Sequence, residues 1–157
     1  MVIVIFLLFA WFCIHVLISL PCKLPFVTNV LLIMTIEIVL INKLTIIGFN
    51  LRLFEINMRV PQFLSLILHN DFTVTFILLT FANVFLTTSK ASVRLGITAY
   101  TFFLQQVTGL ALRWNGVLTD NGWNIVMESV MIVLVMAYTL LMGALFKRMS
   151  SKEGWIR

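Results

Sequence analysis

Five long apolar runs constrain the fold of this chain more than any other feature of its sequence. They cover residues 2–20, 26–48, 68–88, 95–112 and 123–146. A helix needs roughly 20 apolar residues to cross the hydrocarbon core of a bilayer, and each run reaches or nearly reaches that length. The runs also lack the period-two alternation of a membrane β-barrel. We therefore expect an all-α integral membrane protein, a single-domain bundle of about five transmembrane helices.

The composition supports a lipid environment. Hydrophobic residues make up 61% of the chain and charged residues 11%, about half the charged content of an ordinary globular domain. A soluble domain of this size would expose wide apolar patches. The amino-terminal sequence MVIVIF lacks the cationic region of a signal peptide, so we expect run 2–20 to be retained as a span.

The formal charge of +5 is spread over single and paired basic residues. Nucleic-acid binding would require a continuous basic stripe, so we expect no nucleic-acid partner. With five spans, Lys23, Lys90, Arg94, Lys147, Arg148, Lys152 and Arg157 fall on one side and Lys43, Arg52, Arg59 and Arg113 on the other. The positive-inside bias then predicts a cytoplasmic membrane protein with its amino terminus outside and its carboxyl terminus inside.

The segment 49–62, between the second and third runs, mixes apolar and charged residues at partly helical spacing. The apolar residues are Leu51, Phe54 and Met58, and the charged ones are Arg52, Glu55 and Arg59. Such an interfacial amphipathic segment can lie in the headgroup layer as one or two helical turns. A simple solvated loop is the alternative.

Three ionisable residues, Glu37, Lys43 and Glu128, fall within the apolar runs, where charged groups are costly and often functional. The second and fifth spans run antiparallel, which places Lys43 and Glu128 at nearly the same depth. We therefore predict that they form an ion pair. In the alternative, Lys43 extends to the membrane surface along its own stem, and the positive end of the fifth helix stabilises Glu128.

Glu37 lies at the middle of the second span. Asn83 in the third span and Gln105 and Gln106 in the fourth lie at similar depth and are its candidate partners. These residues could form a proton or cation site, or they could be hydrogen-bonding groups that join the helices.

No pattern in the chain predicts catalysis, a metal site or a cofactor. His15 and His69 lack a second metal ligand at helical spacing, and the serines have no nucleophile-elbow setting. Cys13 and Cys22 are nine residues apart, which fits neither a zinc site nor a redox motif. We expect the histidines and cysteines to be packing residues.

The polar stretch WNGVLTDNGWNI, residues 114–125, separates the fourth and fifth runs. Its two Asn-Gly pairs tolerate positive φ, so they allow the chain to reverse. Two tryptophans are expected at the membrane boundary, and Asn121 or Asn124 can cap the fifth helix. The candidate residues of this interfacial turn are Trp114, Asn115, Gly116, Asn121, Gly122, Trp123 and Asn124.

The sequence NGWNIVMESVMIVLVM, residues 121–136, follows YTFFLQQVTGLALRWNGVLTD. Together they resemble the carboxyl-terminal part of a family of small five-span membrane proteins from spore-forming Gram-positive bacteria. The matching residues are Gly116, Asn121, Gly122, Trp123, Asn124 and Ser129. The first run lacks the Trp-Gly-Asp-Trp-like start of that family, and Lys43 and Glu128 have no mapped counterpart. The resemblance implies a membrane location and five spans, and it implies no activity.

These features predict a non-catalytic accessory or scaffold component of the membrane. Besides the lipid bilayer, its expected partner is another membrane protein or a second copy of the chain. A small transporter or channel subunit that uses Glu37 is the second hypothesis, and a lipid-modifying membrane enzyme is the third.

Overall fold

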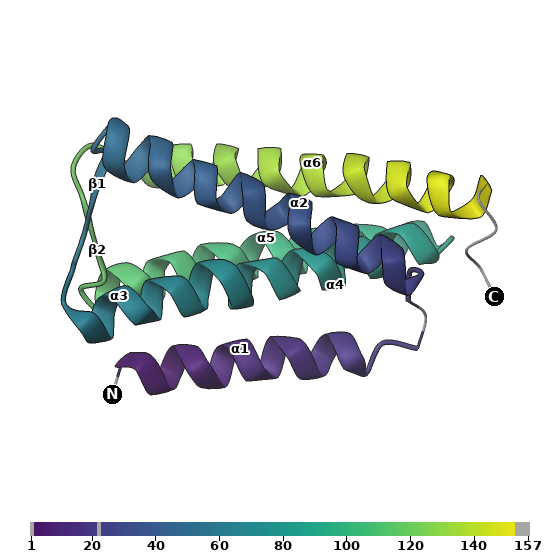
Figure 1. The fold of residues 1–157 in the computed structure, drawn as a ribbon, viewed down its shortest axis with the longest axis horizontal. Helices are drawn as coiled ribbons and strands as arrows, with labels where there is room; N and C mark the ends of the chain where they lie inside the picture. Colours follow the sequence, from purple (N-terminus) through teal and green to yellow (C-terminus); the bar gives the residue numbers. More distant parts are fainter. Residues whose placement is uncertain (1, 22, 153–157) are drawn as a thin grey trace.

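The computed structural model describes residues 2–21 and 23–152. Within them, five helices lie side by side, with a two-stranded sheet at one end of the bundle (Figure 1). The helical elements are α1 (Val2–Ile18), α2 (Phe26–Leu44) with the π-helical η1 (Thr45–Asn50), α3 (Val60–Ile67) with η2 (Leu68–Val74) and α4 (Thr75–Thr87), α5 (Ala91–Trp114) and α6 (Ile125–Lys152). The strands are β1 (Phe54–Ile56) and β2 (Leu118–Asp120). The all-α fold class is confirmed.

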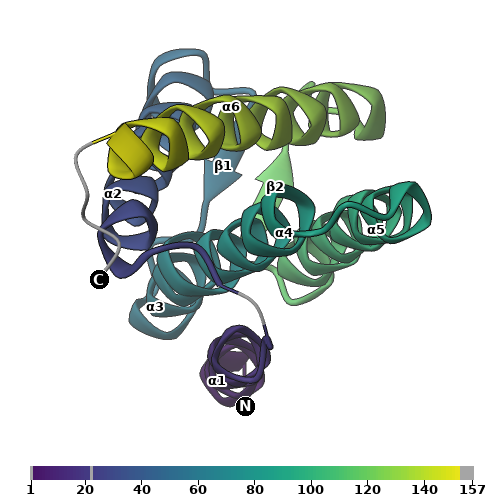
Figure 2. The ribbon, with the colours of Figure 1, turned by 90° about the vertical axis from the view of Figure 1, so that its right-hand side faces the viewer.

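Four helical segments in the described part of the chain are long and apolar enough to cross a membrane. They are Phe26–Asn50, Val60–Thr87, Ala91–Trp114 and Ile125–Ser151. The chain is therefore a multi-pass membrane protein. α1 is equally apolar but has 17 residues, and it lies along the outside of the bundle (Figure 2).

The third span begins earlier than predicted, at Val60 instead of residue 68. Pro61 lies in the first turn of α3, where a missing backbone N–H leaves no helical hydrogen bond unmade. The polar sequence His69-Asn70-Asp71 interrupts the apolar pattern without ending the helix. It falls in the π-helical segment η2, which joins α3 to α4.

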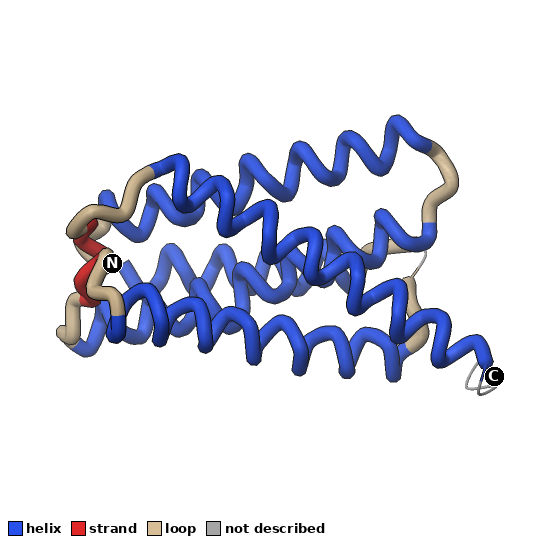
Figure 3. Tube along the Cα trace, turned by 90° about the horizontal axis from the view of Figure 1, so that it is seen from above, coloured by secondary structure: helices blue, strands red, loops and turns tan. Residues whose placement is uncertain are grey.

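The amphipathic helical turns predicted within residues 49–62 are absent from the middle of this segment, which is extended. This segment contains the end of η1, the strand β1 and the start of α3. β1 pairs antiparallel with β2, with Glu55 opposite Thr119 (Figure 3). The pairing provides hydrogen-bond partners for the backbone N–H and C=O groups of β1. Because the partner strand lies some 60 residues further along the chain, the local sequence pattern does not reveal it.

The hydrophobic core is centred on α4. This helix contacts α1, α2, α5 and α6, and it lies between α2 and α5 (Figure 2). Its buried apolar side chains pack against those of α2 and α6. This core contains Leu32, Ile36, Leu40, Val74, Leu78, Leu79, Phe81, Ala82, Ile132, Val135 and Met136. α4 is therefore the helix on which the positions of the others depend.

Asn83 is a fully buried polar residue within this core. Its Oδ1 accepts a hydrogen bond from the Leu24 backbone N–H at 2.7 Å. Its Nδ2 donates to Asn29 Oδ1 and to the Leu79 carbonyl, each at 2.8 Å. Because these bonds satisfy the amide, Asn83 fastens the loop before α2 to the central helix.

Gly143 lies where α6 packs closely against side chains of α2 and α4. A Cβ at this position would lie 2.8 Å from Leu86 Cδ1 and 3.6 Å from Leu32 Cδ2. We expect Gly143→Leu to lower the free energy of unfolding by about 1–3 kcal/mol, because the added side chain overpacks the contact. The measurement is a denaturant titration in detergent micelles.

The matched control is Gly96→Leu on α5, where nothing lies within 4 Å of the added Cβ. It should lose less than about 0.5 kcal/mol. Equal losses for the two variants would contradict the close packing of α6.

Candidate functional site: a polar cluster beneath the sheet

The carboxylate of Glu128, in the first turn of α6, is the centre of a polar cluster. Lys43 Nζ lies 3.4 Å from Glu128 Oε1, so the predicted pair is present. Arg113 Nη2 lies 3.2 Å from Glu128 Oε2, and Trp123 Nε1 donates to the same oxygen at 2.6 Å. Sequence reasoning did not assign these last two partners.

The cluster joins three helix ends. Lys43 is in the last turn of α2, Arg113 is in the last turn of α5, and Glu128 is in the first turn of α6. Each charge has the sign that the dipole of its own helix favours. The Lys43 side chain is 22% exposed, and its ammonium lies against Glu128.

Arg113 connects this cluster to the sheet. Its Nε lies 2.9 Å from Asp120 Oδ2 on β2, and its Nη1 donates to the Gly109 carbonyl at 3.1 Å. A Cβ at position 109 would lie 3.4 Å from Arg113 Nη1, so a glycine there leaves room for the guanidinium. One side chain thus holds α5, α6 and β2 together.

The 114–125 segment forms the second strand and its two flanking turns. Gly116 has φ +63° and Gly122 has φ +110°, so both Asn-Gly pairs use the left-handed region, as predicted. The Asn115 amide donates to the Ala111 carbonyl at 2.7 Å, at the end of α5. The segment is therefore more than a tight reversal, because β2 pairs with β1 between these turns.

Asn124 is the cap of α6. Its Oδ1 accepts a hydrogen bond from the Met127 backbone N–H at 2.9 Å. Asn121, the other candidate, instead donates through Nδ2 to Glu55 Oε1 at 2.7 Å, and its backbone N–H donates to the Leu53 carbonyl. Asn121 therefore joins the two strands and does not cap the helix.

The two tryptophans differ in environment. Trp114 is 82% exposed. Trp123 is 7% exposed and packs edge-on against Phe54 of β1 at 6.3 Å between ring centroids. The strand that covers it lies far away in sequence, so the local pattern could not reveal the burial.

The predicted partners of Glu37 are wrong. Thr75 Oγ1 donates to Glu37 Oε1 at 2.7 Å, whereas Gln106 Nε2 donates to Ser129 Oγ at 2.7 Å and joins α5 to α6. α4 lies between α2 and α5 (Figure 2), so Glu37 does not reach Gln105 or Gln106. Asn83 lies on α4, but it bonds to Leu24 and Asn29 near the start of α2 instead.

A cavity of about 50 Å³ lies beside the cluster, and Lys43, His69, Gln105 and Glu128 are among its lining residues. His69 Nε2 and Gln105 Nε2 are buried without a hydrogen-bond partner in the described part of the chain. The cavity has room for a few water molecules that could bridge such atoms. It is much smaller than typical pockets for organic ligands.

The histidines and cysteines were expected to be packing residues. His69 is buried and lies edge-on to Phe6 at 5.9 Å, and Cys13 is buried in α1. His15 contacts Trp11 on the exposed face of α1, and Cys22 lies outside the described residues. Among the residues that the structure describes, no group of three His, Cys, Asp or Glu side chains could hold a metal ion.

Comparison with protein-family models, curated proteins and solved structures finds no match to this chain. The resemblance to five-span proteins of spore-forming bacteria therefore stays a prediction.

Replacement of Glu128 tests the cluster. We expect Glu128→Gln to lower the free energy of unfolding by about 1.5–3 kcal/mol, because Lys43 and Arg113 would lose a partly buried counter-charge. The control is Asp120→Asn, which removes the partly exposed partner of Arg113 and should lose less than about 1 kcal/mol. If denaturant titrations gave similar losses of unfolding free energy for Glu128→Gln and Asp120→Asn, the central role of Glu128 would be contradicted.

Replacement of Trp123 tests the indole–carboxylate bond separately. Trp123→Phe keeps an aromatic ring against Phe54 but removes the N–H donor. We expect a loss of about 1.5–3 kcal/mol, typical of a hydrogen bond to a charged group. Trp114→Phe, at an exposed position, should change stability by less than about 0.5 kcal/mol. If the two variants unfold at the same denaturant concentration, the bond contributes nothing measurable.

Proposed function

We propose that this chain is a non-catalytic accessory or scaffold component of a bacterial cytoplasmic membrane. It engages another membrane protein, or a second copy of itself, through the sheet end, which we define as the segments 51–60 and 114–124. The single observation that carries the proposal is the saturation of the Glu128 cluster by groups of the chain itself.

The charges of this cluster are engaged in holding elements together. Glu128 contacts Lys43, Arg113 and Trp123, and Arg113 also contacts Asp120 and the Gly109 carbonyl. A catalytic or transported group would need a free polar atom and space beside it. His69 Nε2 and Gln105 Nε2 are unpartnered beside the cluster, but the adjoining cavity of about 50 Å³ has no room for an organic substrate. The arrangement therefore favours a structural role.

The outer surface of the sheet end offers large apolar side chains to a partner. Leu51, Met58, Val60 and Trp114 are each more than half exposed. Trp and Met are enriched at protein interfaces. A surface that is ordered before binding loses less conformational entropy when a partner binds. A partner could bind the sheet end without any rearrangement of the spans.

The distribution of charge supports an orientation. The end of the bundle opposite the sheet carries Lys23, Lys90, Arg94, Lys147 and Arg148, with no carboxylate from the described residues beside them. At and beneath the sheet end, the four cations Lys43, Arg52, Arg59 and Arg113 are balanced in part by Glu55, Asp120 and Glu128. The positive-inside bias places the opposite end in the cytoplasm. With α1 as a fifth span, the amino terminus then lies outside the cell and the carboxyl terminus inside.

The test is photo-crosslinking in native membranes from a benzophenone side chain placed at Trp114. We expect one reproducible protein adduct. The control position is Phe26, at the opposite end, which is 82% exposed as Trp114 is; it should not yield that adduct. Recovery of lipid alone from position 114, with no consistent protein partner, would contradict the proposal.

A transporter or channel subunit is the second candidate, favoured by the position of Glu37, a half-buried carboxylate near the middle of α2 that accepts a bond from α4. Liposomes containing the purified protein distinguish the two functions. A proton or cation flux that is lost in Glu37→Gln but kept in the surface control Glu55→Gln would replace the scaffold proposal. The scaffold proposal expects no flux above that of empty liposomes.

A further inference from the structure

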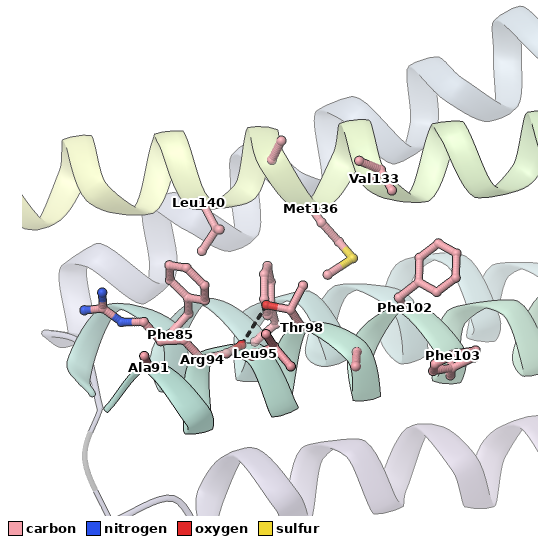
Figure 4. Close-up of a pocket in the computed structure, with 13 residues that line it drawn as sticks. Phe85, Ala91, Arg94, Leu95, Thr98, Phe102, Phe103, Val133, Met136 and Leu140 are labelled. Atoms are coloured by element: carbon pink, nitrogen blue, oxygen red, sulfur yellow. Dashed lines mark hydrogen bonds between the residues drawn. The ribbon is translucent and has the colours of Figure 1, made fainter. Parts of the chain in front are cut away.

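A groove of about 760 Å³ lies between α5 and α6, in the half of the bundle remote from the sheet. Phe81 and Phe85 of α4 and Phe102 of α5 line it, and Met136 and Leu140 of α6 lie across from them. Figure 4 shows these α6 side chains facing the aromatic residues across the space between the helices. The lining is almost wholly apolar.

The groove exists because α5 and α6 are joined at one end only. Gln106 bonds to Ser129, and Arg113 bonds to Glu128, toward the sheet end. Beyond these bonds, small side chains including Ala99 and Ala137 line the space and leave it unfilled. Leu95 and Val133 at its edge are exposed, so the groove opens sideways toward the lipid.

Arg94 is the charged residue among those that line the groove. Its Nε donates to the Thr88 carbonyl at 3.0 Å, and its guanidinium lies 5.3 Å from the centroid of the Phe85 ring. Both Nη groups lack a hydrogen-bond partner within the described residues. These contacts hold the cation at the mouth of the groove with its two outer nitrogens available.

The surroundings of Arg94 strengthen the positive potential. Lys90 precedes it by one helical turn, and Lys147 Nζ donates to the Leu86 carbonyl at 2.6 Å, at the same end of the bundle. No described carboxylate lies near this mouth. The charge and the apolar interior therefore complement a ligand with an anionic head and a hydrocarbon tail.

We propose that the groove binds an acyl chain of an anionic phospholipid whose phosphate lies against Arg94. A guanidinium can bind phosphate through two parallel hydrogen bonds. Basic pockets between transmembrane helices are known to bind such headgroups. The volume of the groove is within the range of small-molecule sites. A partner helix needs a contact surface along most of a span, whereas this groove occupies one half.

Native mass spectrometry tests the proposal on the full chain, in micelles containing equal amounts of dioleoyl-phosphatidylglycerol and dioleoyl-phosphatidylcholine. We expect the protein to retain the anionic lipid preferentially. Arg94→Gln should weaken that retention about fivefold, the effect of one basic residue near a membrane surface. The matched control is Arg148→Gln, which removes a cation from the same end outside the groove and should retain the lipid as the unaltered protein does.

A second variant tests the apolar half of the site. Ala99→Trp places a large ring in the groove and should reduce retention of the lipid. Gly96→Trp on the same helix should not, because Gly96 does not line the groove and nothing lies within 4 Å of an added Cβ there. Equal retention of the two lipids by the unaltered protein, or equal behaviour of Arg94→Gln and Arg148→Gln, would overturn the proposal. The comparison of Arg94→Gln with Arg148→Gln tests the proposal even if Ala99→Trp fails to fold.

Discussion

The carboxylate of Glu128 is the constraint on which the sheet end of this protein depends. A charged group at the start of a membrane helix is stable only when nearby groups replace its lost hydration. Here Lys43 comes from α2, Arg113 from α5 and Trp123 from the loop before α6. Their convergence fixes the relative positions of three helix ends.

The two strands are positioned by the same contacts. Arg113 reaches Asp120 of β2, and Trp123 packs against Phe54 of β1. Backbone N–H groups of Asn121 and Trp123 both donate to the Leu53 carbonyl. Three-residue strands are too short to be stable alone, so the sheet depends on the cluster beneath it and in turn shields the indole from solvent.

The sequence predicted that Lys43 and Glu128 lie at the same level along the bundle, but it did not predict which helix faces contact one another. Apolar runs fix the number of helices, and the helical rise fixes how far each residue lies along the bundle, so Lys43 and Glu128 were correctly paired. Which face of a helix meets which neighbour depends on packing of the whole bundle. Glu37 was therefore assigned Gln105 and Gln106 on α5, and it was assigned Asn83 on α4 although its actual partner on that helix is Thr75. The pairing of β1 with β2 had no local signal.

The two ends of the bundle differ in construction. At the sheet end, the carboxylates of Asp120 and Glu128 are paired with cations of the chain, and apolar side chains are exposed around the two strands. At the opposite end, cations lie beside an open apolar groove between α5 and α6. The proposed partner surface lies at the first of these ends and the proposed lipid site at the second.

Amide hydrogen exchange at the sheet end tests the role of Glu128 most directly. The account predicts slow exchange of the Asn121 and Trp123 amides in the unaltered protein. It predicts exchange at least about tenfold faster in Glu128→Gln, a loss of about 1.4 kcal/mol in local opening, with the amide of Phe81 in α4 unchanged. Exchange at Asn121 and Trp123 that is unaffected by Glu128→Gln would show that the sheet does not depend on this carboxylate.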